Sequence, residues 1–204
     1  MNRDVLKLPN LLTIFRMIMS VVLYGLFMRH FRYDLSTGSL FLFILYLVIA
    51  LTDLVDGIIA RKFDMITELG KELDPLADKV LVFLMLFAFY RIGLFPLWVI
   101  VPVFLRDLFV NWLRKRSRSL GIGFKTSNLA KAKTAVQMIF IGFVMALPAA
   151  QSLPVPPELY RLLADLTSGN VIFAMMFVIM LFTVYTGADY YLKYKKEADR
   201  SNKQ

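Results

Sequence analysis

The sequence predicts an all-α integral membrane protein with six transmembrane helices and a short amphipathic N-terminal segment at the membrane interface. The first observation is composition: 58% of the 204 residues are hydrophobic and the mean hydropathy is +0.63, whereas soluble domains are about 45–50% apolar. The second is a series of apolar segments of about 20 residues, the length that crosses a bilayer. The third is an uneven distribution of cations between alternate connections. The length fits a single domain.

The apolar segments are separated by polar or turn-forming residues. A turn around Gly93 and Pro96 divides the third segment from the fourth. A longer loop with three prolines joins the last two, and residues 157–166 within it are predicted to form a short interfacial helix. The predicted spans are 11–29, 38–60, 76–93, 95–113, 131–150 and 169–191.

The cations predict the orientation. The N-terminus, the 61–79 region, the 114–133 loop and the C-terminal tail together hold 18 Lys and Arg. The opposite connections hold four, namely Arg29, Arg32, Arg91 and Arg161. Because cytoplasmic loops carry the excess of Lys and Arg, we expect both termini to face the cytoplasm from the inner membrane. The net charge of +9 suits anionic lipid or phosphate partners rather than nucleic acid.

Four aspartates lie where charge is costly. Asp53 and Asp56 are near the cytoplasmic end of the second span, and Asp74 and Asp78 begin the third; an Asp at the centre of a span costs about 2.5–3.5 kcal/mol. Each pair shares a helix face by its spacing, and the two antiparallel helices can bring these faces together. Crowded carboxylates cannot all stay ionised unaided. With no cysteine and His30 as the single histidine, oxygen ligation predicts Mg²⁺ or Mn²⁺, and a Ser-His-Asp triad is disfavoured.

Small residues and a cation accompany these carboxylates. Gly57 and Ala60 leave room for a ligand beside the second span, and Arg61 suits a phosphate group. Together with metals they describe a site for a nucleotide diphosphate. Each residue alone has another interpretation, because Gly57 could be a packing notch and Arg61 a topology signal.

The whole pattern resembles the signature of the CDP-alcohol phosphatidyltransferase family, D-x-x-D-G-x-x-A-R-x(8)-G-x-x-x-D-x-x-x-D. The resemblance implies one membrane domain over residues 1–204 and a homodimer. It also implies transfer of a phosphatidyl group from CDP-diacylglycerol to an alcohol, with two metal ions on the aspartates and Asp78 also acting as general base. The matching positions are Asp53, Asp56, Gly57, Ala60, Arg61, Gly70, Asp74 and Asp78.

The resemblance also implies contacts to the CDP group. Such contacts fall on Gly57, Ala60, Arg61 and Thr67. The segment from Pro9 to Arg16 resembles the family's P-N-x-x-T-x-x-R, which places two further residues, Asn10 and Thr13, beside the nucleotide. Helix capping is the alternative interpretation of those two polar residues.

Other stretches of the sequence indicate the acceptor alcohol. The N-terminal segment and the stretches around residues 73–79 and 131–138 resemble the phosphatidylglycerophosphate synthase branch, whose acceptor is glycerol 3-phosphate. Arg106 is the foremost candidate for its phosphate, because this charge lies within an apolar run. The candidate cations for the acceptor phosphate are Arg106, Arg114, Lys131 and Lys133.

Two alternatives stay open. The Arg106-Asp107 pair resembles the cardiolipin synthase branch, which uses phosphatidylglycerol as acceptor, and Ala130 also departs from the synthase pattern. Phosphatidylserine and phosphatidylinositol-phosphate synthesis are further branches. A non-catalytic cation transporter is the alternative of another class, but the acids gather at one membrane face and no inverted repeat is visible.

Overall fold

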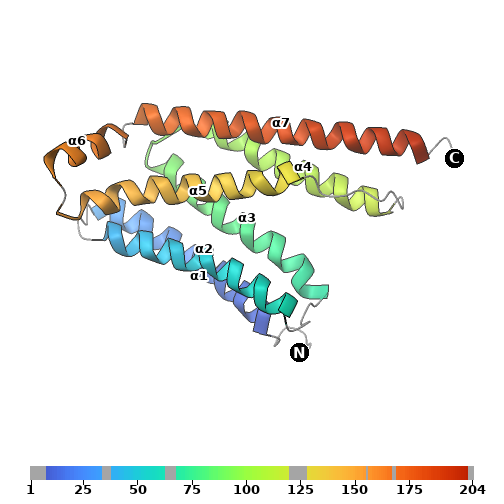
Figure 1. Ribbon diagram of the computed structural model, residues 1–204, viewed down its shortest axis with the longest axis horizontal. Coiled ribbons are helices and arrows are strands. Elements are labelled where there is room, and N and C mark those ends of the chain that lie inside the picture. Colours follow the sequence, from blue (N-terminus) through green and yellow to red (C-terminus); the bar gives the residue numbers. More distant parts are fainter. Residues whose placement is uncertain are drawn as a thin grey trace. The chain divides into compact units, whose positions relative to one another are not determined.

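The structure, a computed structural model, describes the backbone of residues 8–33, 38–62, 68–119, 128–154, 156–166 and 169–201. It describes the side chains of residues 11–32, 38–52, 79–117, 132–154, 156–166 and 169–198. The regular secondary structure of this part of the chain is entirely helical (Figure 1), which confirms the all-α class. The helices are α1 Leu8–Tyr33, α2 Ser39–Lys62, α3 Glu68–Arg91, α4 Leu97–Ser119, α5 Asn128–Gln151, α6 Pro157–Leu166 and α7 Gly169–Ser201.

Each predicted span falls largely within one of the six long helices. Within the described part of the chain, three stretches are long and apolar enough to cross a membrane: Leu11–Arg32, Ala132–Gln151 and Gly169–Ala198. The count of six crossings therefore stays a prediction. The amphipathic segment predicted before α1 lies outside the described residues.

The predicted connections are present. Gly93 has a φ of 82°, a left-handed conformation that glycine adopts without a steric penalty, and the chain turns there from α3 into α4. Pro157 is the first residue of α6, where its fixed φ is compatible with a helix start. The short helix predicted over 157–166 is confirmed, and none of its residues is buried. Its place at the membrane interface stays a prediction.

The chain divides into two compact units. Unit 1 comprises Met1–Ile92 with Ile141–Ser168, and unit 2 comprises Gly93–Phe140 with Gly169–Gln204. Helix α5 contributes its first half to unit 2 and its second half to unit 1. The prediction of one family domain over the whole chain is not tested by this division.

In unit 1, α1 packs against both α2 and α3. Leu23 and Phe27 are buried on α1, and the Phe27 ring meets Phe89 of α3 edge-on at 5.6 Å between centroids. Tyr46 of α2 is buried beside Gly142 of α5, where an added Cβ would lie 3.2 Å from the Tyr46 ring. The core of unit 1 therefore contains side chains of α1, α2 and α3.

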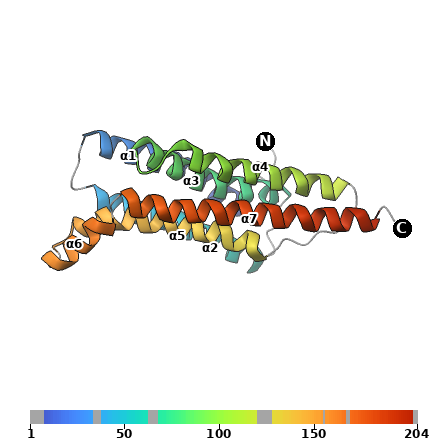
Figure 2. The same cartoon turned by 90° about the horizontal axis from the view of Figure 1, so that it is seen from above.

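In unit 2, α4 and α7 lie side by side (Figures 1 and 2). Val110 and Leu113 of α4 are buried against Tyr190 of α7. Near the other end of the pair, Trp98 meets the rings of Phe173 and Phe177 edge-on, at 6.0 and 6.1 Å between centroids. The aromatic contacts fix how these two helices pack.

Candidate active site

The four signature aspartates lie at one end of unit 1. The N-terminal end of α1, the C-terminal end of α2 and the N-terminal end of α3 all lie at this end (Figure 1). Asp53 and Asp56 occupy one turn of α2, and Asp74 and Asp78 occupy one turn of α3. The helical backbone predicted for both pairs is confirmed. Their side chains, and Thr67 as a whole, lie outside the described residues, so ligation and nucleotide contact are not tested here.

The lengths of α1, α2 and α3 place Arg16, Asp56 and Asp74 at the same level along the helix axes. Arg16 lies 17 residues before the end of α1, and Asp56 lies 17 residues after the start of α2. Asp56 lies six residues before the end of α2, and Asp74 lies six residues after the start of α3. Because every helical residue advances the chain by about 1.5 Å and connected antiparallel helices start level, a cation and two carboxylates share one level of the unit.

Helix α1 has a buried polar face within unit 1. The side chains of Thr13, Arg16 and Ser20 are 1%, 2% and 0% exposed, and the Ser20 hydroxyl donates to the Arg16 carbonyl oxygen at 2.7 Å. Their spacing places them on the face that continues into Leu23 and Phe27. A buried guanidinium is stable only near anions or good acceptors, so Arg16 belongs to the acidic end of the unit.

This placement corrects one interpretation and adds one residue. Thr13 lies in the second turn of α1 and is buried, so helix capping, which serves the first orphan N–H groups, does not explain it. Asn10 lies in the first turn, and its side chain is outside the described residues, as are those of the α2 residues Gly57, Ala60 and Arg61. Sequence reasoning placed Arg16 in the segment that resembles the family's nucleotide-bordering motif but did not name it as a site residue, although its charge within an apolar run was a signal.

A second cluster forms in unit 2 around a carboxylate. The Lys133 ammonium of α5 lies 2.6 Å from both oxygens of Asp107 on α4. Arg106, next in the chain, places Nη1 3.1 Å from the Asp107 Oδ1. The side chains of Lys133 and Arg106 are only 2% and 9% exposed. Two of the predicted acceptor cations are thus brought together by an acid that sequence reasoning had treated only as a departure from a family pattern.

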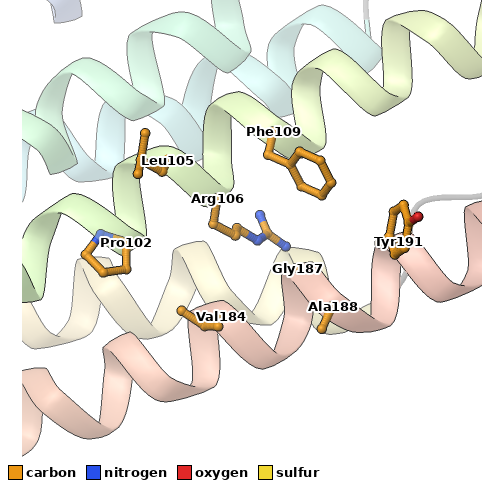
Figure 3. Close-up of a pocket in the computed structure, with 8 residues that line it drawn as sticks. All are labelled: Pro102, Leu105, Arg106, Phe109, Val184, Gly187, Ala188 and Tyr191. Atoms are coloured by element: carbon orange, nitrogen blue, oxygen red, sulfur yellow. The ribbon is translucent and has the colours of Figure 1, made fainter.

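The Arg106 guanidinium keeps one edge free. Its side chain runs from α4 toward Gly187 of α7 (Figure 3), where an added Cβ would lie 2.8 Å from the Arg106 Cγ. Glycine at that position therefore makes room for the arginine. Its Nε and Nη2 are buried and have no hydrogen-bond partner among the described residues. Neighbouring N–H groups of this kind match two oxygens of a phosphate or carboxylate.

Space for a ligand adjoins the Arg106 side chain. Arg106 lines a groove of about 390 Å³ between α4 and α7, and its other walls are mostly apolar. On the α7 side the groove is lined by the small residues Gly187 and Ala188, which leave space for a ligand. The remaining lining residues are Pro102, Leu105, Phe109, Val184 and Tyr191 (Figure 3).

The other predicted cations are not drawn into this cluster by any described contact. Arg114 lies about two turns beyond Arg106 on α4; it is half-buried, and its Nε has no partner among the described side chains. Lys131 belongs to the first turn of α5, and its side chain is outside the described residues. Arg116 lies over the Trp112 ring, 5.5 Å from its centroid.

Comparison with known proteins gives a consistent result. Residues 6–185 match the CDP-alcohol phosphatidyltransferase family. A Bacillus subtilis (strain 168) protein named CDP-diacylglycerol–glycerol-3-phosphate 3-phosphatidyltransferase is 31% identical over 159 residues, covering 78% of this chain and 76% of its own. A probable phosphatidylglycerophosphate synthase of Mycobacterium tuberculosis (strain ATCC 25618 / H37Rv) is 32% identical over 185 residues, covering 90% and 79%. A Rickettsia bellii (strain RML369-C) protein named like the first is 30% identical over 193 residues, covering 93% and 96%.

The family match extends over most of the chain and includes both signature helices, α2 and α3. The apolar helices agree with a membrane location. The alternative of a cation transporter finds no support in these matches. The protein is an enzyme of phospholipid synthesis, a membrane transferase, and the chain belongs to the CDP-alcohol phosphatidyltransferase family.

Proposed function

We propose that this chain transfers the phosphatidyl group of CDP-diacylglycerol to glycerol 3-phosphate, giving phosphatidylglycerophosphate and CMP. The observation that carries the proposal is similarity along nearly the whole chain to a relative named for this reaction, with 93% of this chain and 96% of the relative aligned. The orientation, with both termini and the active site toward the cytoplasm, is part of the proposal and rests on the distribution of Lys and Arg. The homodimer that the family implies is also part of the proposal.

The donor set at the acidic end fits two Mg²⁺ or Mn²⁺ ions. Asp53, Asp56, Asp74 and Asp78 offer only carboxylate oxygens, which these hard cations prefer, and His30 lies near the opposite end of α1. When bound there, the ions would offset the charge that develops on the pyrophosphate as CMP departs.

The protein's own groups then carry the proton and hold the substrate. Asp78 accepts the proton of the acceptor hydroxyl. The hydroxyl oxygen forms a bond to the β-phosphorus, and the bond from that phosphorus to the CMP oxygen breaks. Gly57 and Ala60 let the nucleotide approach α2, and Arg61 offsets its phosphate charge. Arg16, at the height of Asp56, supplies a fixed positive charge.

The residues that border the nucleotide in this proposal are Asn10, Thr13, Gly57, Ala60, Arg61 and Thr67.

Arg106 is the proposed anchor for the acceptor phosphate. Its free Nε and Nη2 edge offers two charge-assisted hydrogen bonds. Asp107 holds Nη1 and the Lys133 ammonium, so it fixes the guanidinium and leaves the cluster with a net positive charge. Arg114 and Lys131 extend this positive region on α4 and α5. A glutamate at position 107 would carry the same charge, so the departure from the synthase pattern keeps the chemistry of the pair.

One observation favours the second candidate, cardiolipin synthesis with phosphatidylglycerol as acceptor. The groove beside Arg106 is mostly apolar and holds about 390 Å³. An acyl chain would bury apolar surface there, and glycerol 3-phosphate has no such chain. The relatives' names favour the first candidate, so the acceptor must be tested directly.

The test uses the purified chain with CDP-diacylglycerol and either Mg²⁺ or Mn²⁺. Glycerol 3-phosphate, phosphatidylglycerol, serine and inositol phosphate are supplied one at a time, and both CMP and the lipid product are measured. We expect product with glycerol 3-phosphate. Product from phosphatidylglycerol and none from glycerol 3-phosphate would replace the first candidate with the second. CMP release without any divalent metal would contradict the metal site.

A further inference from the structure

Three arginines line one cavity at the end of unit 1 away from the aspartates. Arg29 and Arg32 lie in the last turns of α1, and Arg91 ends α3. The cavity holds about 800 Å³, and its other lining residues are Tyr24, Met28, Phe31 and Ile92. Arg91 lies 13 residues beyond Asp78 on one helix, roughly 20 Å at the helical rise. The cavity is therefore separate from the proposed active site.

The cavity carries surplus positive charge. All three arginines are exposed, and the ion pairs found between described side chains include none of the three. Asp34, which lies outside the described residues, can offset one of the three charges at most. Three cations gathered at one opening repel one another, and an anion bound among them would relieve this repulsion.

Helix dipoles explain part of this arrangement. Arg32 and Arg91 each lie in the last turn of a helix, where a cation complements the negative end of the dipole. That effect accounts for one cation at each helix end. It does not account for both side chains lining the same cavity, or for Arg29, which joins them from the preceding turn of α1.

The position along α1 indicates which anion fits. The stretch Leu11–Arg32, which is long and apolar enough to cross a membrane, ends at this cavity. When α1 spans the bilayer, the arginines therefore lie at the level of the lipid headgroups. The preceding turns of α1 expose Ile18, Val21 and Val22 at 57%, 56% and 41%, an apolar surface suited to acyl chains. A headgroup phosphate therefore has its cations and its chain surface on one helix.

We propose that this cavity binds the phosphate of an anionic phospholipid, with the acyl chains lying along the exposed apolar face of α1. Phosphate oxygens accept hydrogen bonds from the three guanidinium groups. Three of the four cations predicted on this membrane side gather here, although the topology rule disfavours cations on that side. The inference does not depend on the identity of the acceptor alcohol.

The experiment measures lipid retained by the intact chain in native mass spectrometry. The probes are phosphatidic acid, which is neither substrate nor product of the proposed reaction, and zwitterionic phosphatidylcholine. The variants are Arg29→Gln, Arg32→Gln and Arg91→Gln. The matched control is Arg161→Gln, because Arg161 is an exposed cation of α6 that does not line the cavity.

We expect each cavity variant to retain roughly fivefold less phosphatidic acid, as one cation near a lipid surface implies. Arg161→Gln should match the wild type, and phosphatidylcholine should bind weakly throughout. CMP release that matches the wild type would confirm that the variants are folded. The proposal would be overturned if Arg161→Gln lost as much phosphatidic acid as the cavity variants, or if no cavity variant lost any. A further outcome is that the wild type binds inorganic phosphate, that Arg91→Gln abolishes this binding, and that no lipid is retained. The cavity would then be a site for a soluble anion, and the lipid proposal would be overturned.

Discussion

The acidic end of unit 1 and the cationic cluster of unit 2 differ in how their residues come together. The four aspartates fall within 26 consecutive residues of two successive helices, so their spacing alone indicates a shared site. Lys133 of α5 and Gly187 of α7 reach the Arg106-Asp107 pair of α4 only through packing. A site within one helical hairpin can be predicted from a linear pattern, whereas a site built across distant helices requires their contacts.

The two regions also differ in counter-charge. The acidic end has Arg16 at its level but four carboxylates to balance, so it depends on metal ions for the proposed chemistry. The cationic cluster contains Asp107, which already binds Lys133 and Arg106. We therefore expect changes at the acidic end to abolish the reaction and changes in the cluster to alter affinity for one substrate.

The largest effect is expected at the proposed metal ligands. Asp53→Ala, Asp56→Ala and Asp74→Ala should each lower CMP release roughly 10³-fold, the scale for removing a key electrostatic group from an active site. The proteins should still insert into membranes. The control is Asp165→Ala, because Asp165 is exposed on α6. Full activity in any of the three ligand variants would contradict the proposed two-metal site.

Asp78→Asn separates metal binding from proton transfer. An amide oxygen can still coordinate an ion but cannot accept the proton, so kcat should fall roughly 10²-fold, the lower end of what a positioned base contributes. Affinity for CDP-diacylglycerol should change much less. Binding measured with the lipid donor alone, beside single-turnover CMP release, checks both quantities. A parallel fall in binding and turnover would make Asp78 mainly a ligand and would place the base elsewhere.

Arg106→Lys tests the cationic cluster. Lysine keeps the charge but cannot form the bidentate contact of a guanidinium. The loss of a charge-assisted hydrogen bond of about 1.5–3 kcal/mol should raise the KM for glycerol 3-phosphate roughly 10- to 100-fold. Affinity for CDP-diacylglycerol should stay nearly unchanged. Arg116→Lys is the control on the same helix, since Arg116 lies over Trp112. An unchanged KM would remove Arg106 from the acceptor site.

The smallest effect is expected at Gly187. A methyl group there would meet the Arg106 Cγ at 2.8 Å, so Gly187→Ala should displace the guanidinium and raise the KM for glycerol 3-phosphate a few-fold, about the effect of a displaced hydrogen bond. Gly169→Ala on α7 is the matched control, because an added Cβ there meets nothing within 4 Å. A similar KM in both variants would show that glycine at 187 does not position Arg106.

Much of the helical framework could be predicted from hydropathy. Each span of about 20 apolar residues lies in one long helix, and the turn at Gly93 and the short α6 were predicted from glycine and proline. Burial within each helix was harder to predict. Thr13 was open to interpretation as a capping residue, yet it lies buried in the second turn of α1, because the face of α1 toward its neighbours is set by packing and not by composition.

The sequence by itself determined the all-α class, the family signature and the placement of each aspartate pair on one helix face. These features depend on local periodicity and on spacing within one hairpin. Only the tertiary structure decided that Asp107 joins Arg106 to Lys133, that Gly187 makes room for the arginine, and that Arg29, Arg32 and Arg91 share a cavity. The physical reason is that such contacts join residues far apart in the chain, and no short-range pattern encodes which faces of packed helices meet.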